Sequence, residues 1–298
     1  MWEKVIRLAL CGMAATTLAA SCWAAGTETS TCADAVVRQR TVLVNTAAGH
    51  IVIADPAAPT RQVTLRPGLM PVVHHLPDGR HALLTTQDGW VIRVDLAQAR
   101  QVAEVRVGQA MRSVALSGTR TALPSVLAVA NATPNTLVLL DENLQTLKVL
   151  KVTDKTGKQA SSIAMVRTAN ARDSFVVSLL DVPELWEVSY KPTAPEIALG
   201  MVHDFQYREG SFVPGYLNAQ RISLPTPVET FHLSNEGHEV LSPHLTPPSG
   251  AVPGVAYMQV THLDVRGKVA EFSLPHWPAS PELMKRIYGE TDCASQAK

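Results

Sequence analysis

The sequence is poor in charged residues, and its charges cancel. Of the 298 residues, 17% are charged, and 26 Lys and Arg balance 26 Asp and Glu. Proteins that bind nucleic acid usually carry a basic patch and a positive net charge. The zero net charge therefore argues against a nucleic-acid-binding protein.

Cysteine is also scarce, and the four cysteines form no cofactor motif. Cys11, Cys22, Cys32 and Cys293 are never spaced as Cys-x-x-Cys-His, so the sequence has no attachment site for a c-type haem. No cluster of Cys and His has the spacing of a zinc site either.

No apolar run is long enough for a membrane-spanning helix, but the N-terminus has the layout of an export signal. Lys4 and Arg7 precede a short apolar run, Leu8 to Leu18, and small residues follow. We expect residues 1–25 to be a signal peptide and the mature protein to be periplasmic. The alternative is a buried N-terminal helix.

Export determines which cysteines the mature chain keeps. Cleavage after residue 25 removes Cys11 and Cys22, but Cys22 follows Ala-Ala-Ser, so a lipid anchor at Cys22 is an alternative. Cys32 and Cys293 then stand near the two ends. Paired cysteines in an oxidising compartment are more often bridged than free, so we expect a Cys32–Cys293 disulfide, with two free thiols as the alternative.

What the sequence does contain is a repeat. An apolar strand that ends near an acidic residue, a turn and a second apolar strand recur along the chain. The reference residues are Asp55, Asp95, Asp141 and Asp264, with Tyr190 near the equivalent point of the fourth repeat, and successive reference residues lie 40, 46, 49 and 74 residues apart. An Asp at the end of a strand can accept hydrogen bonds from the backbone of the following turn.

Two further strand candidates precede each repeat after the first, as in PVVHHLPDGRHALLTT with its Pro77-Asp78-Gly79 turn. Four short strands in 40–50 residues are typical of a β-propeller blade. We therefore predict an all-β fold: a β-propeller of five four-stranded blades over residues 33–278, or six if the terminal segments share one. Residues 279–298 form a tail with a short helix. A β-sandwich is the alternative.

Residues 200–225 interrupt the repeat and are rich in aromatic side chains. Long insertions between propeller strands often carry function. One interpretation is an interaction loop; the other is a loop that packs its own aromatic residues on the propeller. The candidate interaction residues are His203, Tyr207, Arg208, Phe212 and Tyr216.

Several of these segments resemble one family. The segment from Asp173 to Gly215, together with THLDVRGKVAEFSLP and MRSVALS, is similar to the haem-d1 domain family over roughly residues 35–278, and its part from Pro183 to Gly215 is the more specific. That family includes the propeller of the haem-d1 nitrite reductase and relatives that handle the same tetrapyrrole during its biosynthesis. Its propeller has eight blades, so this chain resembles a shortened member.

The resemblance implies a set of cofactor-binding residues. Arg112, in MRSVALS, matches a family arginine that lies against the haem carboxylates, and a guanidinium suits paired carboxylates. His276, in LPHWP, matches an active-site histidine. His232 lies close to a second family histidine, and such a pair would supply protons to bound nitrite. For each of the three, a solvent-exposed polar side chain is the alternative.

The sequence departs from the family at the iron ligand, because Pro71 occupies the position of the ligating histidine. His74 and His75 follow, and one of the two must point inward because neighbouring strand residues face opposite ways. Either is a candidate metal ligand to the haem iron. The alternative is a pair of histidines with no role beyond ending a strand.

The resemblance implies that the chain binds haem d1 or a related tetrapyrrole in denitrification or respiratory metabolism, with a periplasmic cofactor donor or acceptor as partner. The lost ligand and the missing donor haem argue against a self-sufficient nitrite reductase, and no catalytic residue is predicted. The alternative is a non-catalytic propeller that has lost haem binding and binds a protein. A hydrolase or lyase is disfavoured, since no nucleophile lies at a suitable spacing from a base.

Overall fold

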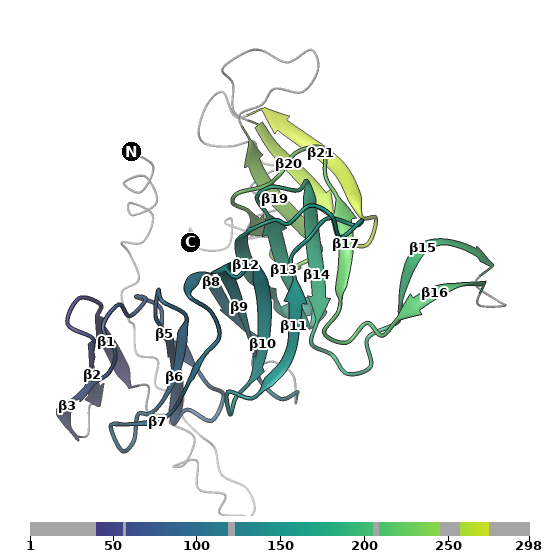
Figure 1. Cartoon of the computed structure of the whole chain (residues 1–298). Helices are drawn as coiled ribbons and strands as arrows, with labels where there is room; N and C mark the ends of the chain where they lie inside the picture. The colour runs from purple at the N-terminus through teal and green to yellow at the C-terminus, as the bar shows by residue number, and fades with distance from the viewer. Residues whose placement is uncertain (1–39, 56–57, 119–122, 205–208, 245–256, 274–298) are drawn as a thin grey trace, which may run out of the picture. The chain divides into compact units, whose positions relative to one another are not determined.

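The computed structural model describes residues 40–55, 58–118, 123–204, 209–244 and 257–273. Within these ranges the regular structure is β-strand apart from one short 3₁₀ turn, η2 (Asn170–Arg172) (Figure 1). The predicted all-β fold is confirmed. The predicted signal peptide, both cysteines of the predicted disulfide, Cys22 and the tail from residue 279 lie outside the described residues.

Apart from β15 (Ile197–Asp204) and β16 (Glu209–Val213), which form a two-stranded sheet of their own, the described strands form five successive antiparallel sheets, each built from strands in chain order. The first sheet has three strands: β1 (Thr41–Asn45), β2 (His50–Asp55) and β3 (Ala58–Thr64). The second has β4 (His74–His75), β5 (His81–Thr85), β6 (Trp90–Asp95) and β7 (Arg100–Arg106). The third has β8 (Ala110–Leu116), β9 (Val126–Thr133), β10 (Thr136–Asp141) and β11 (Thr146–Lys151).

The fourth sheet contains β12 (Ile163–Ala169), β13 (Ser174–Leu179), β14 (Glu184–Ser189) and β17 (Ala219–Ser223). The fifth contains β18 (His232–Leu233), β19 (Glu239–His244), β20 (Tyr257–His262) and β21 (Gly267–Ser273). This repeated four-stranded order is that of β-propeller blades.

The acidic residues that end the third strand of a repeat act as predicted. Asp95 Oδ1 accepts hydrogen bonds from the N–H groups of Ala97 and Gln98, at 2.8 and 2.9 Å. Asp141 Oδ1 accepts from Asn143 and Gln145 in the same way. Each carboxylate therefore holds the turn that follows its own strand.

The core lies between consecutive sheets, because the central strands are buried on both faces. On β9, Leu127 and Val129 pack with the second sheet, whereas Ala128 and Ala130 pack with the fourth. Every residue of β13 is buried. A strand covered on both sides needs apolar residues at successive positions, which explains the continuous apolar runs in the sequence.

The first sheet lacks the counterpart of β4 among the described residues. Arg40, just before β1, pairs with Asp55 at 3.1 Å, as Arg80, just before β5, pairs with Asp95 at 2.6 Å. The strand β1 therefore corresponds to β5. The number of blades in the whole chain stays a prediction.

The segment predicted to be irregular is largely ordered. Strands β15 (Ile197–Asp204) and β16 (Glu209–Val213) form a hairpin inserted between β14 and β17 (Figure 1). The two legs of the insertion meet at Gly215, where a Cβ would lie 2.0 Å from the carbonyl oxygen of Pro195. Only a residue without a side chain fits this approach.

Candidate functional site

The predicted site residues that the structure describes share one position in the repeat: the first strand of a sheet. His74 and His75 lie on β4, Arg112 on β8 and His232 on β18. Each of these strands forms one edge of its sheet. Residues far apart in sequence thus occupy equivalent places in successive sheets.

The first strands of the third and fourth sheets lie side by side. The hydroxyl of Ser113 on β8 accepts a hydrogen bond from the Val166 N–H of β12 at 3.1 Å. The hydroxyl of Thr168 donates to the Leu116 carbonyl at 2.6 Å. These bonds fix the register of β12 against β8.

Arg112 has a free guanidinium. Its side chain is exposed and makes no hydrogen bond or ion pair with any residue in the described ranges. Arg167 on β12 is a second exposed arginine, and its Nε lies 3.2 Å from the Met165 sulfur without a carboxylate among its described partners. The sequence prediction missed Arg167, although it lies on a first strand as Arg112 does.

The two histidines of β4 face different neighbours. His74 is paired with Leu83, whose side chain packs with the third sheet, and His75 is paired with Ala82, which packs with the first. Burial, and to a lesser extent the charge of His75, lowers the pKa of His74. His74 is therefore neutral at neutral pH, as a metal-ligating imidazole must be.

The environment of His232 also favours the neutral imidazole. His232 is an exposed residue, yet the loss of part of its surrounding water lowers its pKa, and the positive charge of Arg167 lowers it further. The charge of Arg167, on the first strand of the fourth sheet, therefore reaches His232, on the first strand of the fifth sheet.

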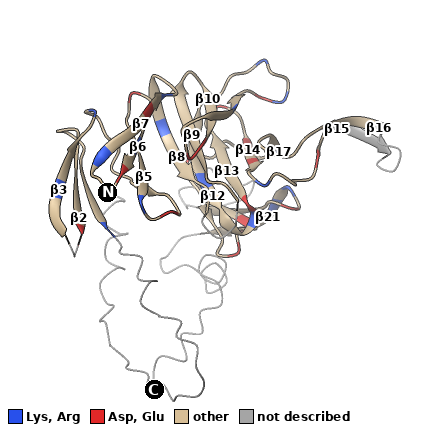
Figure 2. Cartoon of the chain, turned by 90° about the horizontal axis from the view of Figure 1, so that it is seen from below, with Lys and Arg blue, Asp and Glu red and all other residues tan. Residues whose placement is uncertain are grey.

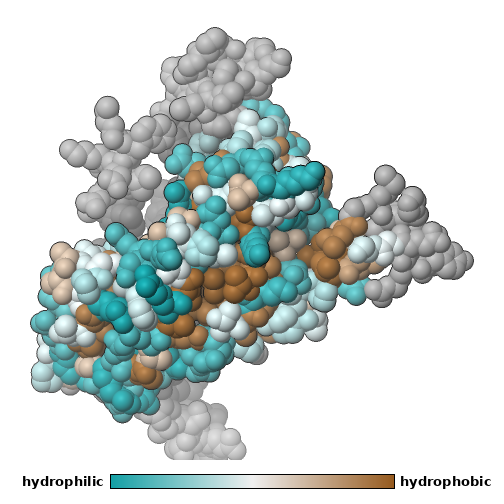
Figure 3. Space-filling model, viewed as in Figure 1, coloured by the Kyte–Doolittle hydropathy of each residue, from teal (hydrophilic) through white to brown (hydrophobic). Residues whose placement is uncertain are grey.

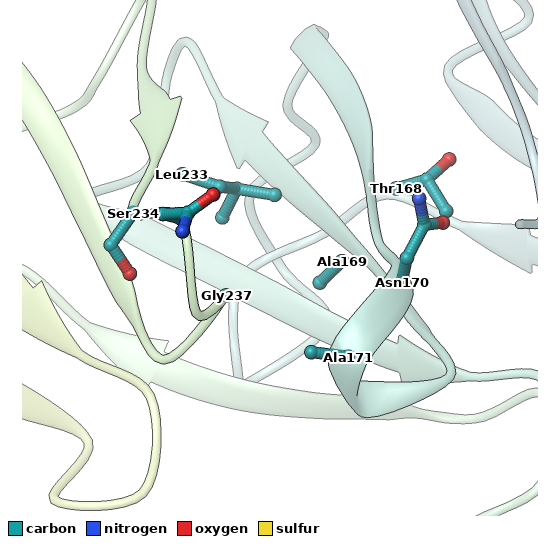
Figure 4. A pocket seen from close by; sticks show the side chains of 8 residues that line it. Thr168, Ala169, Asn170, Ala171, Leu233, Ser234 and Gly237 are labelled. Atoms are coloured by element: carbon teal, nitrogen blue, oxygen red, sulfur yellow. The ribbon is translucent and has the colours of Figure 1, made fainter. Parts of the chain in front are cut away.

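A pocket of about 270 Å³ opens beside these residues (Figure 4). One wall comes from the end of β12 and η2, and the other from the turn after β18. The lining residues are Thr168, Ala169, Asn170, Ala171, Leu233, Ser234, Asn235 and Gly237. Arg167 and His232 each directly precede a lining residue in the sequence.

The remaining predicted residues have mixed outcomes. His276, Tyr207 and Arg208 lie outside the described residues, as does the side chain of His203. Phe212 is half-buried on β16. Tyr216 packs against the core between the third and fourth sheets, which favours a packing role for this residue.

Two further findings concern metals and membranes. Among the residues described here, no group of three His, Cys, Asp or Glu side chains is arranged to hold a metal ion. This does not bear on a single histidine that ligates a haem iron. In the same part of the chain no helix is long and apolar enough to cross a membrane.

Fold and side chains together define a β-propeller that presents guanidinium and imidazole groups along its first strands. A model of the cytochrome D1 heme domain matches residues 37–214, more than half of the chain. The chain belongs to this family.

Two relatives carry the same name. A curated dihydro-heme d1 dehydrogenase of Pseudomonas aeruginosa is 44% identical over 124 residues, which cover 40% of this chain and 24% of the relative. The solved structure of dihydro-heme d1 dehydrogenase NirN in complex with DHE matches with a TM-score of 0.61 and 28% identity, over 80% of this chain and 45% of that one. The chain thus spans less than half of each relative.

Proposed function

We propose that this chain binds a d1-type tetrapyrrole along its first strands and serves in the assembly, storage or transfer of that cofactor in the periplasm. The observation that carries the proposal is the pair of arginines, Arg112 and Arg167, whose guanidinium groups face no carboxylate in the described structure. Guanidinium groups bind carboxylates strongly, and tetrapyrroles of this class carry several.

The described residues fit such a group. Arg112 and Arg167 would hold its carboxylates, and His74 or His75 would ligate the iron, for which the neutral form of His74 is suited. The bound tetrapyrrole would supply the metal and the conjugated ring. His232, neutral beside Arg167, would hydrogen-bond to the bound molecule. His276 belongs to the same proposed set.

Two features of the sequence favour a protein that handles the cofactor over a complete nitrite reductase. Pro71 stands where the resemblance places the iron ligand, and no c-type haem attachment motif occurs in these 298 residues. We therefore propose a binding protein in denitrification or respiratory metabolism, with a periplasmic protein that gives or receives the cofactor as its partner.

The test is titration of the folded protein with haem d1, followed by the change in Soret absorbance. We expect saturable binding at micromolar concentration, and at least about tenfold weaker binding for the double variant Arg112→Ala/Arg167→Ala, since each lost charged hydrogen bond costs about 1.5–3 kcal/mol. Arg100→Ala, which changes an exposed arginine of the fourth strand β7, is the matched control. Absence of binding by the folded wild-type protein overturns the proposal.

A second candidate function is binding of a periplasmic protein through the β15–β16 hairpin. The hairpin pairs with no other described strand, and Leu199 on it is 49% exposed. Figure 3 shows apolar surface over this part of the chain. Exposed apolar surface of this kind supports a protein-binding surface.

A further inference from the structure

The fourth and fifth sheets are linked by a cluster of charged side chains that the proposed function does not use. Arg172, in η2, lies at its centre: its Nε donates to Glu187 Oε1 at 2.8 Å, and its Nη2 donates to Asp264 Oδ1 at 2.8 Å. The third nitrogen, Nη1, lies 3.0 Å from Nδ1 of His238. Arg172 and Glu187 belong to the fourth sheet, whereas His238 and Asp264 belong to the fifth.

One nitrogen of this cluster has two partners with opposite requirements. Nδ1 of His238 lies 3.0 Å from Arg172 Nη1, which can only donate, and 3.3 Å from Asp264 Oδ2, which can only accept. A neutral imidazole with its proton on Nε2 accepts from Arg172. A protonated imidazole carries a proton on Nδ1 and can donate only to Asp264. The two bonds exclude each other.

We propose that His238 is a proton-operated switch between these two bonds. In the neutral state, Arg172 holds the fifth sheet twice, through His238 and through Asp264. When a proton binds to Nδ1, the Arg172–His238 hydrogen bond breaks and a hydrogen bond within the fifth sheet, from His238 to Asp264, replaces it. Protonation therefore leaves one link between the sheets where there were two.

The position of His238 in the repeat supports this assignment. Arg80 stands directly before β5 and pairs with Asp95 at the end of β6. Arg40 stands directly before β1, the counterpart of β5, and pairs with Asp55 at the end of β2. His238 stands directly before β19, and Asp264 follows β20. A protonated His238 takes the place of those arginines. Histidine makes that link conditional, because imidazoles change charge between about pH 5 and 8.

The other charged or titratable groups around His238 have partners of their own, so we assign the switch to His238 alone. Glu187 is held by Arg172 and by the Ser174 hydroxyl. The ring of His262 stacks on that of His238 with centroids 6.1 Å apart, but its Nδ1 accepts the backbone N–H of Asp264 and lies 4.0 Å from the carboxylate.

Two further acidic residues stand on the element of His238 itself. Glu236 and Glu239 lie in the turn before it and on β19. Among the described contacts, the carboxylate partners of Arg172 are Glu187 and Asp264.

The switch acts on the walls of the pocket. Ala171 and Gly237 line it from opposite sides and directly precede Arg172 and His238 (Figure 4). A Cβ placed on Gly237 would lie 3.6 Å from that of Ala171, so the walls meet here. Loss of one of the two links is expected to loosen both walls at acid pH.

Hydrogen exchange measured by mass spectrometry tests this in the full chain. After correction for the chemical exchange rate, peptides over residues 168–173 and 233–240 should exchange several-fold faster near pH 5 than near pH 8. His238→Gln, which stays neutral, should keep the slow rate at both pH values. His238→Arg, which stays charged, should show the fast rate at both.

His262→Gln is the matched control and should retain the wild-type pH response. Protection of the buried strand β13 shows that each variant is folded. A wild-type protein without the response, a His238→Gln protein that keeps it, or its loss in His262→Gln would each overturn the proposal. None of these outcomes depends on tetrapyrrole binding.

Discussion

Arginine side chains in this protein differ in role according to the groups that face them. Arg80 lies against a buried carboxylate, Asp95, whereas Arg112 and Arg167 face no described carboxylate. The first arrangement stabilises the fold, and the second leaves a cation available to a ligand. In Figure 2, Lys and Arg are interspersed with Asp and Glu over the described chain, so the distinction is local and does not come from a broad basic face.

The Asp95 carboxylate is expected to contribute measurably to stability. Burial alone would raise its pKa, but hydrogen bonds from Arg80 and from the N–H groups of Gln98 and Ala97 lower the pKa to about 2. We expect Asp95→Asn to lower the free energy of unfolding at neutral pH by about 1–3 kcal/mol. Urea denaturation measures this.

The same measurement at low pH provides the control. Because the folded pKa is depressed, the contribution is fully present above the unfolded pKa near 4 and is lost as the pH falls through about 2. The difference between wild type and variant should shrink over that range. A difference that stays constant would contradict the assignment.

At the scale of elements, stability is expected to depend on which strand of a sheet is changed. Leu127 on β9 is fully buried between sheets, whereas Leu147 on β11 is 40% exposed. Leu127→Ala should cost about 2–4 kcal/mol of unfolding free energy because it leaves a cavity. Leu147→Ala, the matched change, should stay within about 0.5 kcal/mol. Equal losses in denaturant would show that the central strands do not carry the core.

The β15–β16 hairpin can be removed without breaking the fourth sheet, because neither strand pairs with β12, β13, β14 or β17. Ala198 and Phe212 are cross-strand partners, so an Asn-Gly turn between them replaces residues 199–211 with a favoured two-residue loop. We expect the denaturation midpoint and tetrapyrrole binding to be unchanged. If the hairpin binds a protein, a pull-down from periplasmic extract should lose that partner. Loss of tetrapyrrole binding in the folded variant would instead place the hairpin in the cofactor site.

The stability of the whole molecule should depend on pH through two histidines whose pKa values are lowered by the loss of surrounding water. The pKa values of His74 and His232 are lowered in the folded state, so the unfolded chain binds more protons below about pH 6.5. The free energy of unfolding should therefore rise with pH up to that value. His74→Gln should flatten this slope in denaturation curves measured near pH 5 and near pH 7.5. An unchanged slope would contradict the burial effect.

The fold was predictable because its signals are local. Each repeat contains an apolar run, a closing acidic residue such as Asp95 and a turn, all close together in the sequence, and this pattern recurs along the chain. The hairpin was not predicted, because β17 joins β14 only after a long insertion. Pairing between strands separated in this way depends on backbone contacts that no local pattern specifies.

The sequence by itself determined the all-β repeat and the family resemblance, and it named Arg112, His74 and His232 as candidates. The structure placed these three on the first strands of their sheets. Tertiary structure decided which charges are neutralised. Arg167 became a candidate because no described carboxylate faces it, and Arg172 became a link between sheets because Asp264 does face it. Spacing along the chain does not encode these contacts, since they arise only when neighbouring sheets pack face to face.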